Sequence, residues 1–413
     1  MPDAEIIAVG SELLTPDKLD TNSLWLTDQL NGLGVEVVRK TVVGDDRGRL
    51  TETIRVAMSR SQVIVTTGGL GPTEDDLTRD AAAAALGRGL IFHQEICDQI
   101  EARFRRFNRK MVEINKRQAF VLDGAEALPN DRGTAPGQWF HDNGITILLL
   151  PGPPNELKAM FEKQCLPRLE KLLPAQVIRT RFYRTVGLPE SDLDQMIAPI
   201  YTKYTNPATN ILAVSGEIHV QLRARCATEE QAAAILDEVC NQIEPLLGDR
   251  IYSRNGDPLE KVAGDLLRQK RAHLTVAESA TGGLLGARIT SVPSSSDYFV
   301  GGFVTYTDRT KTELLGVPAA MIEEHTAVSE PVAKAMADGA RQRTGADYAL
   351  SITGYAGPDG DKVGLVFIGL ATPHGVEARR IQFPGDRERV RAFSTNIALD
   401  MLRRELLAAD ERR

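Results

Sequence analysis

Apolar runs of strand length alternate with helical patterns through the first 172 residues, and this alternation constrains the fold more than any other feature. The candidate strands are residues 5–9, 35–43, 62–67 and 145–150. Between them, residues 21–33 and 47–59 carry apolar side chains at helical spacing, and Asp20 stands at the expected N-cap of the first helix. Strands that alternate with helices predict a parallel α/β sheet whose functional loops gather at the carboxyl ends of its strands.

Two turn-forming clusters divide the rest of the chain, Leu173-Pro174 and Asn255-Gly-Asp-Pro258. They predict three domains, at residues 1–172, 173–254 and 255–413. The middle segment has an α+β pattern, with strands at 178–186 and within 211–226 and helices at 190–201 and 229–247. The last segment has an α/β pattern, with a helix at 259–269, strands at 274–277, 299–306, 348–353, 363–371 and 379–383, and a closing helix at 387–407.

Composition and charge narrow the possible classes of function. The net charge is −7, from 49 basic and 56 acidic residues, so no general basic field draws the chain to nucleic acid. The basic stretch at 103–117 favours a solvated helix face over a nucleic-acid or phosphate patch. Four widely spaced cysteines predict reduced thiols in a cytoplasmic protein. The longest apolar run has the length of a strand, which predicts that the chain does not span a membrane.

A glycine-rich turn, Gly68-Gly-Leu-Gly-Pro-Thr73, directly follows the strand at 62–67. Glycines let backbone N–H groups approach an anion, and the threonine adds a hydroxyl donor. Four aspartates follow two strand ends nearby: Asp45, Asp46, Asp75 and Asp76. Carboxylates grouped in this way suit a hard divalent cation such as magnesium. The alternative is a tight turn that leads into a capped helix, because aspartate also caps helix N-termini.

The stretch from Leu274 to Gly316 is the second concentration of reactive side chains. It joins an apolar strand to Glu-Ser-Ala-Thr-Gly-Gly and then supplies Ser296, Tyr306 and Lys311. Serine is a weak nucleophile that needs a base, and a lysine serves as that base when burial or a nearby cation lowers its pKa. The alternative is a solvated serine-rich loop with a surface lysine.

Five motifs in this region resemble the C-terminal domain of the CinA family over residues 255–408: Thr275-Val-Ala-Glu-Ser, Thr281-Gly-Gly, Gly302-Phe-Val-Thr-Tyr, Ala327-Val-Ser-Glu-Pro and Thr353-Gly-Tyr-Ala-Gly-Pro. That family includes nicotinamide mononucleotide (NMN) deamidases, which are Ser/Lys amidohydrolases. The resemblance implies Ser296 as nucleophile, Lys311 as its base and Tyr306 as their partner, with no cofactor. It also implies a substrate site made of Ser279, Thr281, Gly282, Gly283, Thr353, Gly354 and Arg387.

Three positions depart from the pattern usual in that family. Ala280 stands in place of a cysteine, Ser294 stands in place of a glycine, and the segment after Gly357-Pro-Asp-Gly360 is short. Because glycine tolerates a positive φ, the serine at 294 is expected to change how the serine-rich loop turns.

The N-terminal motifs resemble the molybdopterin-binding fold of molybdenum-cofactor biosynthesis proteins, and more closely the N-terminal CinA domain, over residues 3–172. They are Gly10-Ser-Glu-Leu-Leu14, Asp20-Thr-Asn22, Gly44-Asp-Asp46, the turn at 68–73 and Pro151-Gly-Pro-Pro-Asn-Glu156. The resemblance implies a metal-dependent ADP-ribose pyrophosphatase. Its nucleotide site would contain Glu12, Asn22, Gly68, Gly69, Gly71, Thr73 and Glu156, and its divalent metal, Mg²⁺ or a similar ion, would be held by Asp45, Asp75 and Asp76.

The middle segment is similar to the small KH-like domain of long CinA proteins. Its Gly187-Leu-Pro-Glu lacks the GxxG loop that clamps a nucleic-acid backbone, which favours a spacer over RNA binding. Taken together, the motifs predict an enzyme of pyridine-nucleotide recycling that deamidates NMN and splits ADP-ribose. The resemblance also implies a homodimer. Two alternatives stay open: a non-catalytic factor in competence or DNA damage, and a pterin-binding protein.

Overall fold

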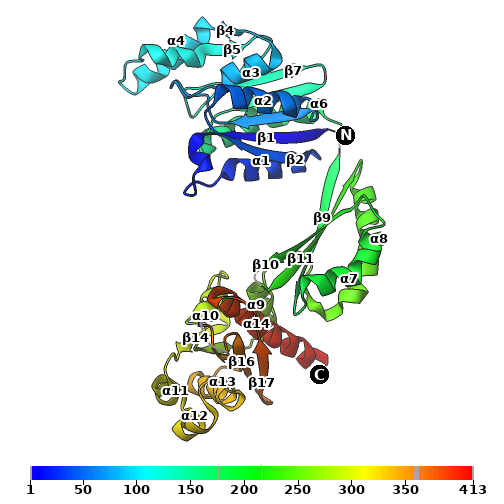
Figure 1. Ribbon diagram of the computed structural model, residues 1–413, viewed down its shortest axis with the longest axis vertical. Coiled ribbons are helices and arrows are strands. Elements are labelled where there is room, and N and C mark those ends of the chain that lie inside the picture. The colour runs from blue at the N-terminus through cyan, green and yellow to red at the C-terminus, as the bar shows by residue number, and fades with distance from the viewer. Residues whose placement is uncertain (1, 175, 215, 358–361, 412–413) are drawn as a thin grey trace. The chain divides into compact units, whose positions relative to one another are not determined.

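The structure is a computed structural model that describes residues 2–174, 176–214, 216–357 and 362–411. It contains two compact units, Met1–Arg179 with Arg225–Ala232, and Thr180–Ala224 with Ala233–Arg413 (Figure 1). A six-stranded sheet belongs to the first unit, and four-stranded and five-stranded sheets to the rest of the chain. The fold is therefore mixed α/β, as predicted. No helix in the described ranges is long and apolar enough to cross a membrane.

The N-terminal sheet has the strand order β2-β1-β3-β8-β7-β6. Its parallel strands are β1 (Asp3–Val9), β2 (Glu36–Val43), β3 (Val63–Thr67) and β8 (Ile145–Leu150), which confirms the sequence pattern. The antiparallel strands β6 (Glu126–Leu128) and β7 (Gly137–Asp142) extend one edge and were missed in the sequence.

Helices cover both faces of this sheet. The helices α1 (Thr21–Gly32), α5 (Pro154–Met160) and α6 (Leu166–Leu172) cover one face, and α2 (Arg47–Met58) and α3 (Thr78–Leu86) cover the other. Asp20 and Asp46 cap α1 and α2, because each side chain accepts a hydrogen bond from a backbone N–H of the first turn.

A small subdomain of the same unit carries the basic stretch at 103–117. It consists of α4 (Gln94–Arg106), the 3₁₀ helix η2 (Glu113–Ala119) and the pair β4 (Leu90–Phe92) and β5 (Phe120–Leu122). The stretch was expected to form one helix face, but α4 ends at Arg106 and the chain leaves the helix there.

The middle sheet has the order β10-β11-β9-β12 and confirms the α+β pattern. Its elements are β9 (Val177–Val186), α7 (Glu190–Tyr201), β10 (Ala208–Val214), β11 (Glu217–Cys226), α8 (Glu229–Leu247) and β12 (Ile251–Ser253). The predicted strand region 211–226 is an antiparallel pair of strands, β10 and β11.

The C-terminal sheet has the order β14-β13-β15-β16-β17. Three strands are parallel, β13 (Leu274–Glu278), β14 (Phe299–Val304) and β15 (Tyr348–Gly354), and two are antiparallel, β16 (Leu365–Thr372) and β17 (Gly375–Gln382). The helices α9 (Leu259–Lys270), α10 (Leu284–Thr290) and α14 (Arg387–Glu411) bury one face, and α11 (Asp308–Leu315), α12 (Ala319–His325) and α13 (Glu330–Thr344) bury the other.

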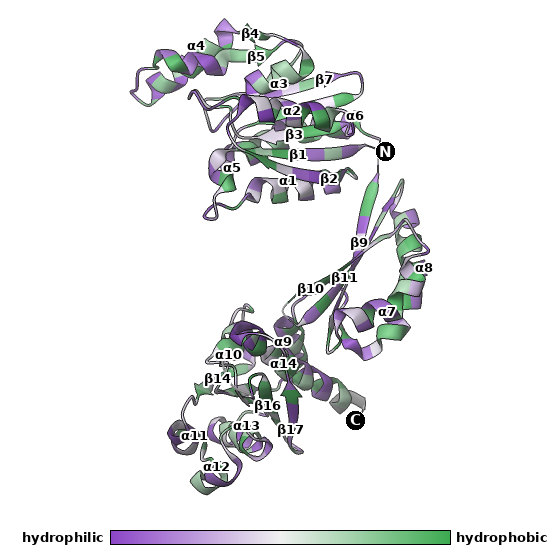
Figure 2. Cartoon of the chain, in the orientation of Figure 1, coloured by the Kyte–Doolittle hydropathy of each residue, from purple (hydrophilic) through white to green (hydrophobic). Residues whose placement is uncertain are grey.

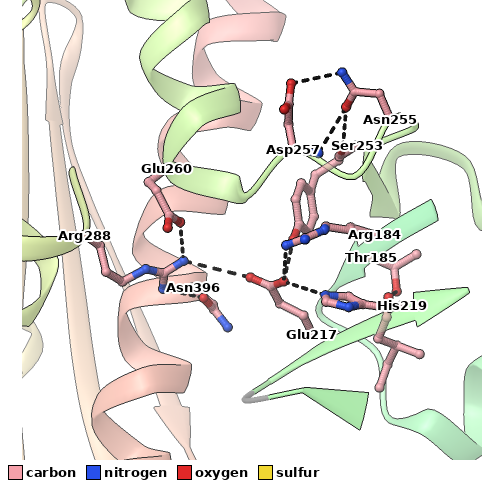
Figure 3. A network of polar contacts seen from close by, with 12 residues as sticks. Arg184, Thr185, Glu217, His219, Ser253, Asn255, Asp257, Glu260, Arg288 and Asn396 are labelled. Atoms are coloured by element: carbon pink, nitrogen blue, oxygen red, sulfur yellow. Dashed lines mark hydrogen bonds and ion pairs between the residues drawn. The ribbon is translucent and has the colours of Figure 1, made fainter. Parts of the chain in front are cut away.

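A buried polar network joins β11 to helices of the C-terminal sheet (Figure 3). Glu217 accepts a hydrogen bond of 2.5 Å from the Tyr252 hydroxyl and lies 3.9 Å from the Arg288 guanidinium. Arg288 on α10 also pairs with Glu260 of α9 at 2.6 Å and donates to Asn396 of α14. The network holds α10 in place, and α10 begins directly after the turn at residues 279–283.

Candidate functional sites

The carboxyl edge of the C-terminal sheet brings together side chains that are far apart in sequence. Ser279 directly follows β13, Lys311 follows β14 on the first turn of α11, and Thr353 lies at the end of β15. The backbone N–H of Ser279 donates to the Ile352 carbonyl at 2.9 Å. The end of β15 therefore holds in place the turn at residues 279–283, which is called the serine turn below.

Lys311 and Ser279 form a buried pair. Lys311 is 1% exposed, and its Nζ lies 3.3 Å from Ser279 Oγ and 3.1 Å from the Thr305 carbonyl oxygen. Burial lowers the pKa of the Lys311 amine, and Asp308, whose carboxylate lies 3.8 Å away, offsets this in part. A buried lysine with a lowered pKa beside a serine hydroxyl is the arrangement that an activated nucleophile requires.

The predicted pairing of Ser296 with Lys311 is wrong. Ser296 is exposed on the 3₁₀ helix η5 (Ser295–Asp297), which precedes β14, whereas Lys311 follows it. β14 has six residues, so its ends are roughly 20 Å apart at about 3.3 Å per residue. The serine-rich loop is fixed at the opposite edge, where Arg268 donates to the Ser294 carbonyl at 3.0 Å. Ser294 itself adopts a φ of 59°, so the loop keeps a left-handed turn without glycine.

Glu278 occupies the anion position at the start of α10. Its carboxylate is 1% exposed and accepts three backbone hydrogen bonds, from Gly283 (3.0 Å), Leu285 (3.0 Å) and Gly286 (2.8 Å). The N–H groups of the predicted substrate residues Gly282 and Gly283 therefore both have partners within the protein, since the Gly282 N–H donates to the Ser279 carbonyl. The sequence signal that was missed is a glutamate at the end of a buried strand.

Other predicted substrate residues surround this turn with different partners. Arg387 donates to the Tyr306 hydroxyl at 3.2 Å, so Tyr306 pairs with a predicted binding residue and not with Ser296. Thr353 donates its hydroxyl to the Ala327 carbonyl at 2.8 Å, which gives it a structural partner. A side chain at Gly354 would lie 2.7 Å from Val366, so glycine allows β16 to pair closely there.

Two further features of this site were not foreseen. Arg391 on α14 donates to the Thr281 carbonyl at 2.7 Å and 3.2 Å and so holds the serine turn from the opposite side. The hydroxyls of Thr281 and Thr305 are buried and have no hydrogen-bond partner within the described ranges. The short segment after Gly357 falls on residues 358–361, which lie outside the described residues.

The glycine-rich turn at 68–73 forms one wall of a cavity of about 380 Å³ in the first unit. Gly68 and Gly69 have φ values of 106° and 66°, and a side chain at either would lie within 2.3 Å of a neighbouring oxygen. Arg79 is 2% exposed and donates to the carbonyls of Leu70 and Gly71 at 2.6 Å and 2.8 Å. Burial lowers the pKa of Arg79 to about 10, so the guanidinium stays charged at neutral pH and fixes the turn.

Five carboxylates line the same cavity, on Glu12, Asp45, Asp75, Asp76 and Glu156. Within the described ranges no three acids, histidines or cysteines converge on one metal position, so the predicted set of Asp45, Asp75 and Asp76 is not brought together as a cage. Asp76 accepts from the Thr73 N–H at 2.8 Å and from its hydroxyl, and Asp45 accepts from the Ser11 N–H at 2.7 Å. Asp76 and Asp45 both accept these hydrogen bonds through their Oδ2 atoms. One or two carboxylates are enough when substrate phosphates complete the coordination of Mg²⁺.

The remaining predicted nucleotide residues divide into two groups. Glu12 and Glu156 line the cavity, and Asn130 donates to the Glu156 carboxylate at 2.8 Å. Asn22 instead joins two strand ends, because its amide donates to the Thr67 hydroxyl at 3.0 Å and to the Gly152 carbonyl at 2.7 Å. Gln118, which the sequence reading missed, also lines the cavity and is 2% exposed.

Comparison with known protein families finds a match for three segments of the chain. Residues 5–171 match the family described as "Probable molybdopterin binding domain", residues 180–253 match "Damage-inducible protein CinA KH domain", and residues 256–406 match "CinA C-terminal domain". The chain is 59% identical to a CinA-like protein of Solibacter usitatus, with 98% of both chains covered. It is 48% identical to a CinA-like protein of Koribacter versatilis, over 98% of this chain and 100% of the relative. The chain therefore belongs to the CinA family.

Solved structures of the same family match parts of the chain. A CinA superfamily protein from Klebsiella pneumoniae is 31% identical, with 37% of this chain and 99% of that chain covered and a TM-score of 0.36. A CinA protein from Thermoplasma acidophilum is 28% identical, with 41% and 98% covered and a TM-score of 0.38.

Proposed function

We propose that the C-terminal domain is an amidohydrolase that converts NMN to nicotinate mononucleotide and ammonia, with Ser279 as nucleophile and Lys311 as base. The observation that carries this proposal is the buried contact of 3.3 Å between Lys311 Nζ and Ser279 Oγ. Ser279 replaces Ser296 in the role first predicted for it, and the lysine keeps its predicted role.

The proposed reaction uses this pair in two half-reactions. The neutral Lys311 amine takes the Ser279 proton while Oγ attacks the carboxamide carbon, and the resulting ammonium gives that proton to the departing ammonia. Water then attacks the acyl ester through the same lysine, which releases the carboxylate and restores the serine. The lowered pKa of Lys311 supports this order, because an ordinary lysine is protonated at neutral pH and accepts nothing.

The neighbouring side chains suit an anionic nucleotide. Arg387 and Arg391 both reach the edge that carries Ser279, and their charges match a substrate phosphate. No metal or other cofactor has a part in this proposed step.

The test is steady-state ammonia release from NMN by matched alanine variants of the full chain. Ser279→Ala is expected to reduce turnover about a thousandfold or more, whereas Ser296→Ala, the same change at an exposed serine, is expected to leave it intact. Lys311→Arg is expected to be as inactive as Lys311→Met, since a guanidinium does not accept a proton. Substantial turnover in Ser279→Ala, or loss of turnover in Ser296→Ala, would contradict the assignment.

We also propose that the N-terminal cavity hydrolyses ADP-ribose in a metal-dependent reaction. The cavity with its fixed glycine turn and five carboxylates favours this activity, because diphosphate oxygens beside so many acids need a cation between them. When bound, the divalent ion would be held by Asp76 and Asp45 and would polarise the phosphorus centre. Arg79 holds the glycine-rich turn in position, and Thr73 holds Asp76.

Asp76→Asn is expected to abolish metal-stimulated ADP-ribose hydrolysis and to leave ammonia release from NMN unchanged. Asp46→Asn is the matched control, because Asp46 caps α2 and does not line the cavity. A simultaneous loss of both activities in the folded Asp76 variant would contradict two independent sites.

A further inference from the structure

A second cavity, of about 600 Å³, lies in the unit that contains the C-terminal sheet. It opens between β17, η4 (Gly248–Arg250), the turn at Gly187 and the second half of α14. Arg404 of this cavity follows Arg391 by 13 residues on α14, which is roughly 20 Å along the helix axis at about 1.5 Å per residue. The cavity is therefore separate from the Ser279–Lys311 pair.

The aspartates of the cavity are already neutralised. Asp400 is 5% exposed and pairs with Arg403 and Arg404, each at 2.6 Å. Asp249 pairs with Arg404 as well, and its carbonyl accepts from Arg403 at 2.8 Å. Both carboxylates of the cavity are therefore paired with arginines.

Three more arginines belong to the lining, Arg250, Arg379 and Arg380. Arg379 lies on the same face of β17 as Ile381, which packs on the α14 side, whereas the side chain of its neighbour Arg380 starts on the opposite face. Within the part of the chain that the structure describes, none of their side chains has a hydrogen bond or an ion pair, and both strand arginines are exposed. The lining holds four arginines and two aspartates, so it carries a net charge of +2 in a chain whose net charge is −7. Like charges gathered without partners repel one another, and an anion removes that repulsion.

The rest of the lining is apolar and comes from Val186, Ile381 and Ile397. Figure 2 shows the contrast between the hydrophobic inner strand β16 and the more hydrophilic β17 at the edge. A cavity of this volume falls in the range that holds small organic ligands, about 300–1,000 Å³. Guanidinium forks bind phosphate in bidentate fashion, and the aliphatic wall offers a surface for a flat base.

We propose that this cavity binds a nucleoside diphosphate or a close phosphorylated relative. The phosphates lie against Arg250 and Arg379, and the base packs against Ile381 and Ile397. The proposal does not depend on either proposed activity, because none of these side chains belongs to the two sites described above.

The experiment is calorimetric titration of the full chain with ADP in the presence of EDTA, which suppresses metal-dependent binding in the N-terminal cavity. The double variant Arg379→Gln/Arg380→Gln is expected to bind ADP about tenfold more weakly, or worse, for each charged hydrogen bond that is lost. The matched control is Arg309→Gln/Arg343→Gln, which makes the same change in charge at exposed arginines of the same unit and is expected to stay within about twofold of wild type. Arg250→Gln, a single change outside the strands, is a second variant and is also expected to weaken ADP binding.

Several results would overturn the proposal. They are absence of ADP binding by the wild type, equal weakening in the control pair, or unchanged affinity in both cavity variants. Charged side chains on an edge strand such as β17 also discourage aggregation. Aggregation of the double variant with unchanged ADP affinity of the monomer would assign the arginines to that role instead. Binding of a single-stranded oligonucleotide in place of ADP would also refute a nucleotide site.

Discussion

Replacing Glu278 by glutamine tests whether this carboxylate sets the shape of the serine turn. Its Oε2 accepts from the backbone of Gly283 and Leu285, and its Oε1 accepts from Gly286. A glutamine offers one acceptor oxygen, and its NH₂ group faces a backbone N–H wherever the second oxygen stood. At least one buried N–H therefore loses its partner, and the start of α10 loses its counter-charge.

The expected cost follows from these losses. An unpaired buried donor costs about 1–3 kcal/mol, and an anion at a partly buried helix N-terminus contributes up to about 2 kcal/mol. The sum, roughly 1–5 kcal/mol, corresponds to a fall of about 2–20 °C in the Tm of a domain of about 150 residues. Glu377→Gln on the exposed face of β17 is the matched control and is expected to change stability by less than about 0.5 kcal/mol.

Calorimetry of the full chain measures the fall in Tm, and amide exchange locates its origin. Faster exchange is expected at Gly283, Leu285 and Gly286 in the Glu278 variant, together with lower ammonia release from NMN. Unchanged exchange at these three amides, with an unchanged Tm, would show that the carboxylate does not organise the turn.

Three further predictions concern groups whose burial or backbone geometry is unusual. The pKa of Lys311 is lowered in the folded state, so the free energy of unfolding is expected to rise with pH between that lowered value and 10.5. Urea titrations of Lys311→Met should lack this rise. At neutral pH they should show a free energy of unfolding that is higher by about 1.4 kcal/mol for each unit by which the pKa is lowered. Gly69→Ala places a Cβ 2.2 Å from the Thr78 hydroxyl at a φ of 66°, so it is expected to cost about 1–3 kcal/mol and to abolish ADP-ribose hydrolysis, whereas Gly89→Ala, in open space, should do neither. Arg79→Met leaves two loop carbonyls without their donor and is expected to destabilise the first unit by about 2–4 kcal/mol in denaturant titration; an unchanged midpoint would contradict the role given to this guanidinium.

Much of the fold could be read from local patterns, because buried parallel strands are apolar throughout and the helices between them have caps. β1, β3 and β8 coincide closely with the predicted runs, and Asp20 and Asp46 cap α1 and α2. The antiparallel strands β4 to β7 were missed, since several have only three residues and depend on tertiary pairing.

The error at Ser296 has a geometric origin. Ser296 was paired with Lys311 because the two are close in sequence. The strand β14 lies between them, so they stand at opposite ends of that strand. Ser279 and Lys311 each follow a parallel strand, so the rule that functional loops lie at the carboxyl ends of strands would have paired them. The lysine's burial and the carboxylate of Glu278 depend on packing between distant segments, which no local pattern records.

The hydrogen bond from Arg391 to the Thr281 carbonyl bears on the order in which the parts of the C-terminal site form during folding. The two residues are separated by 110 positions in the chain. Contacts of such separation form late, after local helices and strand pairs, because closing a long loop costs entropy before any contact offsets it. We therefore expect the serine turn to take its final form only when α14 docks on the sheet, so that a chain without this helix would lack the contact that holds Thr281.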